Sequence, residues 1–366
     1  VTFYSGLYRL NLYPNSQSEN TGTADAPVWQ SASPVRAREG SATATQTNAQ
    51  IMDGQIYVNN GFWDTYRTVW PLYSMLYPEV TERLVDGFVQ QYRDGGWIAR
   101  WSSPGYADLM TGTSSDASFA EAYTSGAIST ALAEEAFAAA LRNATVSSGS
   151  DTTLENPNAV GRKGITTSQF LGYTADTTGQ SVSWGLEGSI NDAAMADMAA
   201  MLAEDPEVAP EQQAVYAEHA VYFESRASDF VNMFDPSVGF FQAREPDGSW
   251  ELSPEEYDPT DWQNHAYTEA PGWTFAFHAP FDVPALAALY GGSDGLDAKL
   301  EEFYATPETA TSSAIHEAFE ARDVRMGQFG FSNQVSHHTP YISAANGDPT
   351  TTQEVVREVL SRLYVG

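Results

Sequence analysis

The chain has 366 residues, of which 42% are hydrophobic and 13% aromatic, and its formal net charge is −31. A chain this acidic has no basic patch for phosphate groups, which excludes nucleic acid as a partner and disfavours an anionic membrane. It contains no Cys, so disulfides, thiolate zinc sites and cysteine nucleophiles are excluded. No apolar run reaches the roughly 18 residues of a membrane-spanning helix.

Apolar residues recur at helical spacing along most of the chain. The predicted helices cover residues 3–13, 62–77, 79–93, 117–127, 130–143, 182–203, 211–233, 271–290, 296–304, 309–321 and 352–364. A break between the helices at 62–77 and 79–93 is expected at Pro78, because proline cannot continue a helix. We also expect a short strand around a turn at residues 51–58 and another hairpin-like piece at 238–251.

Long segments rich in Gly, Ser, Thr and Asp separate these helices. They cover residues 14–50, 101–116, 144–181, 235–270 and 322–334. Loops of this length in a compact domain are usually functional or disordered, and the absence of a fixed-period repeat disfavours a solenoid. About eleven helices in antiparallel pairs favour an all-α, double-layered α/α toroid, which carries its site where the loops gather.

Five segments combine aromatic residues with carboxylates and amides at loops or helix ends. They are WDTYR at 63–67, GGWIARW at 95–101 with SSD at 114–116, SVSWGLEGSIND at 181–192, YTEAPGW at 267–273 and SNQVSHH at 332–338. Glycosidic cleavage needs a protonated carboxyl for the leaving oxygen and a second carboxylate that activates water or attacks the anomeric carbon. These parts are therefore the candidates for a sugar-cleaving site.

Two of the carboxylates also have a structural interpretation. Asp64 fits a helix N-cap, or a partner for Arg67 three residues later. Glu187 shares a helix stripe with Ser183 and Asn191, which is also typical of a hydrogen-bonded contact between helices. Both interpretations stay open beside the functional one.

Glu269 is the better candidate for a catalytic acid. It precedes Pro271 in a loop with His265, Tyr267 and Trp273. The pattern therefore assigns it no helical scaffold role, and functional residues concentrate on such loops. The alternative is a position beside a helix N-cap.

A metal site is expected around Asn333 and Gln334. His337 and His338 are adjacent, so their side chains do not face one another on a helix, and two such imidazoles seldom share an ion. No HxxxH or HExxH pattern is present, which disfavours zinc. The amide oxygens of Asn333 and Gln334 suit calcium instead, with loop capping as the alternative.

The ordered motifs resemble glycoside hydrolase family 92, the calcium-dependent, inverting exo-α-mannosidases. They are LYRLNLYPN, WDTYR, GGWIARW, SVSWGLEGSIND, MFDPSVGFFQAR, DGSW, YTEAPGW, APFDVPALAALYGG and SNQVSHHTPYISAANGDPTTTQEVVREVL. The resemblance implies an (α/α)6 toroid behind an N-terminal β-sandwich. It also implies that calcium bridges two mannose hydroxyls.

The resemblance assigns roles residue by residue. Glu269 matches the general acid, and Asn333 and Gln334 match the loop around calcium. The predicted substrate-binding residues are Trp63, Asp64, Arg100, Trp101, Asp116, Glu187, Phe331 and His338. The implied partner is a mannose-containing N-glycan or yeast-type mannan, met by a secreted bacterial protein.

Two departures from the family pattern shape the expectations. The general base of the family follows the helix that ends this chain, so residues 1–366 are expected to be one incomplete domain that is inactive without the remaining segments of the same polypeptide. On the leaving-group side the family's residues are replaced by Gln334, Val335, Phe331 with Ser332, Phe281 and Arg9. The linkage therefore stays open, and a mannosyl-phosphate substrate is one alternative.

Two other classes of function also stay open. One is a catalytically inactive, carbohydrate-binding helical module. The other is a different toroid enzyme, such as a polysaccharide lyase or a glucuronyl hydrolase, although the acidity of the chain disfavours a polyanionic substrate.

Overall fold

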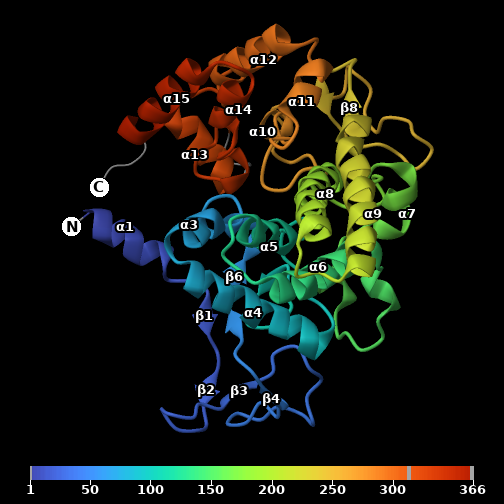
Figure 1. Ribbon diagram of the computed structural model, residues 1–366. Helices are drawn as coiled ribbons and strands as arrows, with labels where there is room; N and C mark the ends of the chain where they lie inside the picture. Colours follow the sequence, from blue (N-terminus) through green and yellow to red (C-terminus); the bar gives the residue numbers. More distant parts are fainter. Residues whose placement is uncertain (1, 311–314, 363–366) are drawn as a thin grey trace. The chain divides into compact units, whose positions relative to one another are not determined.

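The computed structural model describes residues 2–310 and 315–362, and helices alternate in it with long irregular segments (Figure 1). This described part holds fifteen α-helices and nine strands of two to four residues. The helix-rich character predicted from the sequence is confirmed. None of the described helices has both the length and the apolar character needed to cross a bilayer.

The chain divides into two compact units, and the first comprises Val1–Thr166 and Asn191–Ser225. Its complete helices are α1 (Thr2–Leu10), α2 (Phe62–Thr65), α3 (Val69–Leu76), α4 (Pro78–Gly95), α5 (Ser115–Thr124) and α6 (Thr130–Thr145), with 3-10 turns at Ser148–Ser150 and Pro157–Ala159. Residues 191–204 of α8 (Ser181–Glu204) and most of α9 (Pro210–Ala227) belong to it as well. Helices α5 and α6 pack side by side (Figure 1).

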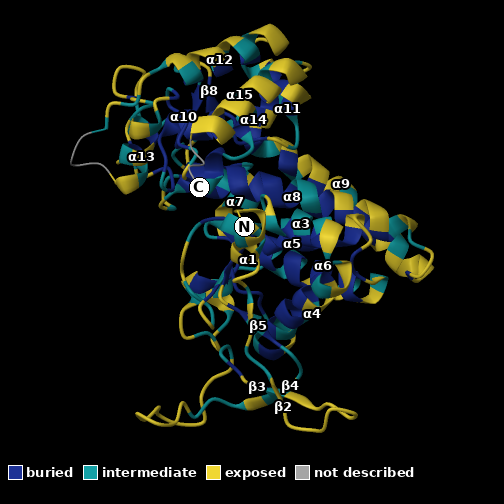
Figure 2. Ribbon diagram, turned by 90° about the vertical axis from the view of Figure 1, so that its left-hand side faces the viewer, coloured by how far each residue is buried: buried dark blue, intermediate teal, exposed yellow. Residues whose placement is uncertain are grey.

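The strands of the first unit form three small antiparallel sheets. They are β1 (Asn15–Ser16), β2 (Glu19–Asn20), β3 (Trp29–Ala32), β4 (Ile51–Asp53), β5 (Tyr57–Val58), β6 (Asn60–Gly61) and β7 (Trp101–Ser102). The pairings are β1 with β5, β2–β3–β4, and β6 with β7. Figure 2 shows that β2, β3 and β4 are mostly exposed.

The second unit comprises Thr167–Ile190 and Arg226–Gly366. Its helices are most of α7 (Ile165–Leu171), the 181–190 part of α8, α10 (Gly272–Phe275), α11 (Val283–Leu289), α12 (Ser293–Ala305), α13 (His316–Val324), α14 (Thr339–Ala345) and α15 (Pro349–Arg362). The 3-10 turns Ser228–Met233 and Gln334–Ser336 and the antiparallel pair β8 (Phe234–Asp235) and β9 (Phe240–Phe241) complete it. Helices α14 and α15 pack together (Figure 1).

An aromatic cluster forms the centre of the first unit. The Phe62 ring stacks on Trp70 at 5.6 Å between centroids and meets Phe88 at 4.9 Å and Phe119 at 5.6 Å. All four side chains are at most 1% exposed. Burying rings of this size removes a large apolar area from water, so the cluster fixes where α2 begins.

Helix α4 follows directly from local sequence. Pro78 occupies its first turn, where a missing N–H costs nothing. Gly96 ends it in the left-handed conformation with φ +80°, as glycine commonly does at helix C-termini. The predicted break at Pro78 is confirmed, because α3 ends at Leu76.

The prediction of one helix over residues 271–290 is wrong. The structure has two short helices there, α10 and α11, separated by residues 276–282. Pro280 has no backbone N–H to donate to a preceding turn, and Asp282 starts a new helix by accepting a bond from the amide of Ala285 at 3.0 Å. An aspartate with Pro284 just after it is a standard helix start.

Three further predictions of local structure need correction. Residues 62–77 form two helices, α2 and α3, because Thr68 lies outside the helical region with φ −144°. The strand predicted within residues 51–58, by contrast, is confirmed: β4 and β5 lie there and pair with β3 and β1 respectively. The predicted loop 144–181 contains α7. In the predicted helix 309–321, residues 311–314 lie outside the described part, and α13 begins at His316.

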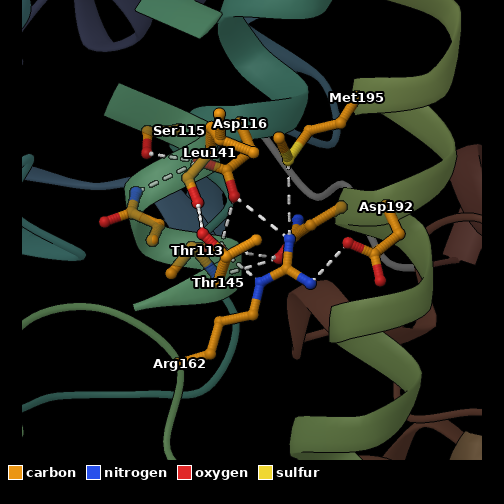
Figure 3. Close-up of polar contacts among 10 residues, drawn as sticks. Thr113, Ser115, Asp116, Leu141, Thr145, Arg162, Asp192 and Met195 are labelled. Atoms are coloured by element: carbon orange, nitrogen blue, oxygen red, sulfur yellow. Dashed lines mark hydrogen bonds and ion pairs between the residues drawn. The ribbon is translucent and has the colours of Figure 1, made fainter. Parts of the chain in front are cut away.

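A buried ion network ties together four segments of the first unit (Figure 3). The Arg162 guanidinium lies 2.6 Å from Asp192 Oδ1 and 3.3 Å from Asp116 Oδ2, and its Nε donates to the Thr113 hydroxyl at 3.2 Å. Asn143 donates to the other oxygen of Asp116 at 3.2 Å. Burial raises the pKa of Asp116 to about 6, although the Arg162 charge opposes that rise. The network therefore depends on the Arg162 cation at its centre.

Removing that cation is expected to destabilise the protein in a pH-dependent way. Arg162→Met leaves two buried carboxylates without their countercharge, which costs roughly 3–5 kcal/mol of unfolding free energy at neutral pH. The folded-state pKa of Asp116 already lies above its ordinary value and rises further in the variant. Its unfolding free energy should therefore be highest at acidic pH and fall as pH rises.

Urea unfolding of the parent and the variant between pH 4.5 and 7.5 measures this. Arg83→Met, at an exposed arginine on α4, is the matched control and should change stability by less than about 1 kcal/mol. A loss in Arg162→Met that did not grow with pH would contradict the role of the network.

A glycine makes room for a tryptophan in the β6–β7 pair. Gly61 is paired with Trp101, and a Cβ at position 61 would lie 2.5 Å from the Trp101 ring. Gly61→Ala should therefore lower the unfolding free energy by about 1–3 kcal/mol through overpacking. In Gly6→Ala the new Cβ meets nothing within 4 Å, so this control should be neutral or slightly stabilising. Equal unfolding midpoints for both variants would disprove the close approach.

Candidate active site

The loop 264–270, called the acid loop below, is anchored on the first turn of α8. The Ala266 carbonyl accepts bonds from the amides of Val182 and Ser183 at 3.1 and 3.3 Å. The Ser183 hydroxyl accepts a bond from the Thr268 amide at 2.8 Å. The first amides of a helix have no partner within the helix, so the loop serves as the cap of α8 and is held in place by it.

A buried tyrosine anchors the same loop from the other side. The Tyr267 hydroxyl lies 2.8 Å from the Tyr257 hydroxyl and also donates to the Phe241 carbonyl. Its ring stacks on Phe275 at 5.6 Å. Burial raises the pKa of Tyr267 well above its ordinary value, so the hydroxyl stays a donor at all physiological pH values.

Glu269 follows these anchors in an unusual backbone conformation. Its φ is +50°, in the left-handed region, which costs a non-glycine residue about 1–2 kcal/mol. Its carbonyl accepts a bond from the Asn333 side-chain amide at 2.8 Å, and its side chain is half-buried. Strain of this kind persists only where surrounding contacts impose it, and it clusters at functional sites.

The two predicted metal ligands lie at the start of the 3-10 turn Gln334–Ser336. The Asn333 side chain is 4% exposed, and because its nitrogen binds Glu269, its oxygen points elsewhere. That oxygen has no hydrogen-bond partner among the described residues. A buried amide oxygen without a partner carries a desolvation cost, and a hard cation such as calcium would offset it. The donor chemistry therefore fits the predicted ion.

Glu187 lies four residues after Ser183 on α8 and faces a histidine pair. Its Oε1 is 2.9 Å from His278 Nε2, and both side chains are fully buried. The rings of His278 and His338 are 5.0 Å apart, and His338 Nε2 donates to the Phe277 carbonyl at 2.9 Å. Glu187 therefore forms a buried hydrogen-bonded contact, as its structural interpretation predicts. Its role in substrate binding stays a prediction.

The β6–β7 pair brings four predicted residues of the first unit together. Trp63 and Asp64 lie in α2, directly after β6, while Arg100 directly precedes β7 and Trp101 begins it. The Phe62 amide donates to the Arg100 carbonyl at 3.4 Å. The WDTYR and GGWIARW motifs are therefore neighbours in space.

In this group, Asp64 has a carboxylate that is available to bind a ligand. It lies inside α2 and is not the N-cap, and its carboxylate has no hydrogen-bond partner in the described part of the chain. Burial raises its pKa to about 6, opposed by the Arg67 charge. The indole nitrogen of the adjacent Trp63 is buried and unpartnered among described residues. Perturbed carboxylates beside unsatisfied donors are typical of binding sites.

Arg100 and Asp116 are bound mainly to the protein itself. Arg100 is 3% exposed, and its guanidinium lies 2.7 Å from Asp108 and donates to the carbonyls of Gly161 and Asn158 at 3.0 and 2.8 Å. Asp116 is 1% exposed within the Arg162 network. Their contribution to sugar binding stays a prediction.

Phe331 precedes the amide pair and packs on a histidine. Its ring lies 4.9 Å from the His337 ring, and His337 Nε2 donates to the Phe331 carbonyl at 3.1 Å. The adjacent histidines therefore have different environments, with His337 on Phe331 and His338 on Phe277.

Two residues of these clusters lie outside the motifs from which the site was predicted. His278 carries the contact with Glu187, and Arg162 carries the network around Asp116. Neither lies in a segment that paired an aromatic residue with a carboxylate. A buried carboxylate needs a cationic or donor partner, but pattern alone cannot say which distant residue supplies it.

Comparisons with known proteins place this arrangement in context. The chain is similar to an inverting mannosidase of family GH92 from Bacteroides thetaiotaomicron, with 27% identity and a TM-score of 0.77 over 99% of this chain and 45% of that one. It also resembles an α-mannosidase of the same family and organism in complex with mannoimidazole, with 18% identity, a TM-score of 0.74 and coverages of 99% and 42%. The chain thus spans less than half the length of these relatives.

No curated protein sequence matches the chain. The model of the "Glycosyl hydrolase family 92 catalytic domain", in contrast, matches residues 1–366, which is the whole of the sequence. The resemblance seen in its ordered motifs is confirmed, and the chain belongs to glycosyl hydrolase family 92.

Proposed function

We propose that the polypeptide carrying this chain is an exo-α-mannosidase that removes terminal α-linked mannose with inversion. The observation that supports this most is the acid loop, which holds Glu269 in a strained conformation by contacts with α8 and Asn333. The family membership and the similarity to mannosidases agree with it. For the helical domain as a whole we propose the (α/α)6 toroid.

In this proposal Glu269 is the general acid. Its protonated carboxyl donates a proton to the glycosidic oxygen as the bond from the anomeric carbon to that oxygen breaks. A water molecule attacks the anomeric carbon from the opposite face and loses its proton to a carboxylate base. The family resemblance leads us to expect that base outside residues 1–366, so this chain supplies one half of the acid–base pair.

The WDTYR segment is the proposed contact for the terminal mannose. The Asp64 carboxylate accepts bonds from sugar hydroxyls when ionised, and the indole nitrogen of Trp63 is a donor that the described protein leaves unsatisfied. The remaining predicted contacts are Arg100, Trp101, Asp116, Glu187, Phe331 and His338. The substrate would be a mannose-containing glycan, met outside the cytoplasm.

Calcium is the proposed cofactor, held in part by Asn333 and Gln334. When bound, it would polarise the mannose hydroxyls and favour a distorted ring. Asn333 has two tasks in this proposal, since its nitrogen holds the Glu269 carbonyl while its oxygen is available for the ion. The residue would therefore link the position of the acid to the ion.

Replacing the acid tests the proposal through the leaving group. In the complete polypeptide, Glu269→Gln should lower kcat/KM for an unactivated mannobiose by roughly 100- to 10,000-fold, the usual contribution of a general acid. Activated aryl mannosides should lose much less, because their leaving group needs no proton. Kinetics on both substrates measure the difference, with Glu255→Gln at an exposed position as the control.

Equal losses on both substrates would remove Glu269 as the acid. A mannosyl-phosphate diester serves as a third substrate in the same series. High activity on it, with little dependence on Glu269, would favour the phosphate alternative over a glycosidic linkage.

Metal removal tests the cofactor. Treatment with EDTA should abolish turnover, and calcium should restore it, whereas magnesium should restore less because it demands a smaller octahedral site. Asn333→Ala should raise the calcium concentration needed for half-maximal recovery by about tenfold or more. Calcium-dependent thermal shifts provide a readout independent of turnover. Full activity in EDTA would contradict the assignment.

A further inference from the structure

Three side chains of the second unit converge at a point that the proposed mechanism does not use. His265 Nε2 lies 3.0 Å from Asp176 Oδ1 and 3.3 Å from Glu251 Oε1. One donor atom from each of the three residues lies within 4.8 Å of the others. They come from the turn before α8, the end of the 243–251 segment and the start of the acid loop.

We propose that Asp176, Glu251 and His265 form a binding site for a divalent transition metal such as zinc. Two ligand atoms on an ion with bonds of roughly 2.0–2.2 Å lie about 3.0–3.5 Å apart. The separations of 3.0 and 3.3 Å between His265 Nε2 and the two carboxylates fall in that range. The site is distinct from the proposed calcium site at Asn333 and Gln334.

The donor set selects the class of ion. One imidazole nitrogen with two carboxylates suits zinc and other borderline divalent metals, whereas calcium prefers oxygen ligands alone. Both carboxylates approach the same nitrogen, His265 Nε2. A proton on this nitrogen can form a well-directed hydrogen bond to only one carboxylate, whereas a metal ion can be bound by the nitrogen and both carboxylates together.

Local charge also favours a cation. The Asp176 and Glu251 side chains are 18% and 19% exposed, so their charges are only partly screened by water. The negative charge of Glu245 also acts on Glu251. The nearby cation, Arg244, instead lies over Tyr173 and Trp250 and donates to the carbonyls of Gly248 and Asn232.

The backbone holds the three ligands in place before any ion arrives. The Asp176 amide donates to the Arg244 carbonyl at 2.8 Å, and the Glu251 amide donates to the Ala243 carbonyl at 3.0 Å. The Gln180 amide donates to the His265 carbonyl at 2.9 Å. Ligands held by rigid neighbours lose little entropy when they bind a metal. The 57% exposure of His265 leaves a path for the ion and open positions for water.

An ion at this site would cross-link the start of the acid loop to two other segments. This consequence rests on the proposed function, because it concerns the position of Glu269, but the metal site itself does not. Binding should raise the midpoint of thermal unfolding and should weaken at acidic pH, where protons compete for the imidazole.

A second histidine offers a matched control. His316 also contacts two carboxylates, with Nε2 at 2.9 Å from Glu317 and Nδ1 at 3.2 Å from Glu320. These contacts use opposite nitrogens, so the two carboxylates do not converge on one ligand atom. His316 is 78% exposed. His316, Glu317 and Glu320 are also one histidine and two carboxylates, but because the carboxylates contact different nitrogens they should not bind an ion tightly.

The test is calorimetric titration of the tag-free complete polypeptide with zinc chloride in saturating calcium, with cobalt absorption spectra as a second readout. We expect one saturable zinc site and visible cobalt bands typical of nitrogen and oxygen ligation. His265→Gln should weaken zinc binding by more than the roughly 10- to 100-fold that loss of an outer-shell partner costs. His316→Gln should leave binding unchanged.

Asp176→Asn and Glu251→Gln should each weaken binding too, and thermal unfolding in EDTA checks that every variant is folded. If one variant does not fold, the others decide the result. No saturable zinc binding, or binding that survives all three substitutions, would overturn the proposal. These results do not depend on mannosidase turnover, so a failure here is distinguishable from a failure of the proposed function.

Discussion

The position of Glu269 depends on the bond between the Ala266 carbonyl and the first amides of α8. A helix start that is buried without a cap leaves several N–H groups unsatisfied, at a cost of roughly 1–3 kcal/mol each. The acid loop removes that cost for Val182 and Ser183, and α8 in turn fixes the loop. The left-handed backbone at Glu269 is tolerated because these bonds, together with Asn333, determine its neighbours on both sides.

The acidic side chains of this chain fall into distinct physical classes. Asp116 is fully surrounded and compensated by Arg162, so it serves the fold of the first unit. Asp64 is half-buried with no direct partner among the described residues, and its raised pKa reflects burial. Asp176 and Glu251 converge on one imidazole. The net charge of −31 distinguishes none of these classes, because what each carboxylate does depends on its neighbours and its exposure to water.

Local rules predicted much of the fold and failed at identifiable points. Pro78 and Gly96 delimit α4 as expected, because both act within one helical turn. The continuous helix predicted over residues 271–290 does not form, since Pro280 removes a donor and Asp282 caps a new helix. The apolar spacing over these residues is compatible with one long helix or with two short ones. Helix α7 was missed because seven residues within a polar stretch give too short a pattern for periodicity to detect.

The sequence by itself determined the family, because matching ordered motifs requires only the residue types and their order along the chain. It also identified Glu269, Asn333 and the WDTYR segment as candidates. Only the tertiary structure decided which partners these residues have: His278 for Glu187, Arg162 for Asp116, and the meeting of Asp176, Glu251 and His265. The physical reason is that these contacts join segments far apart in the sequence, and only the packing of the folded chain sets such distances.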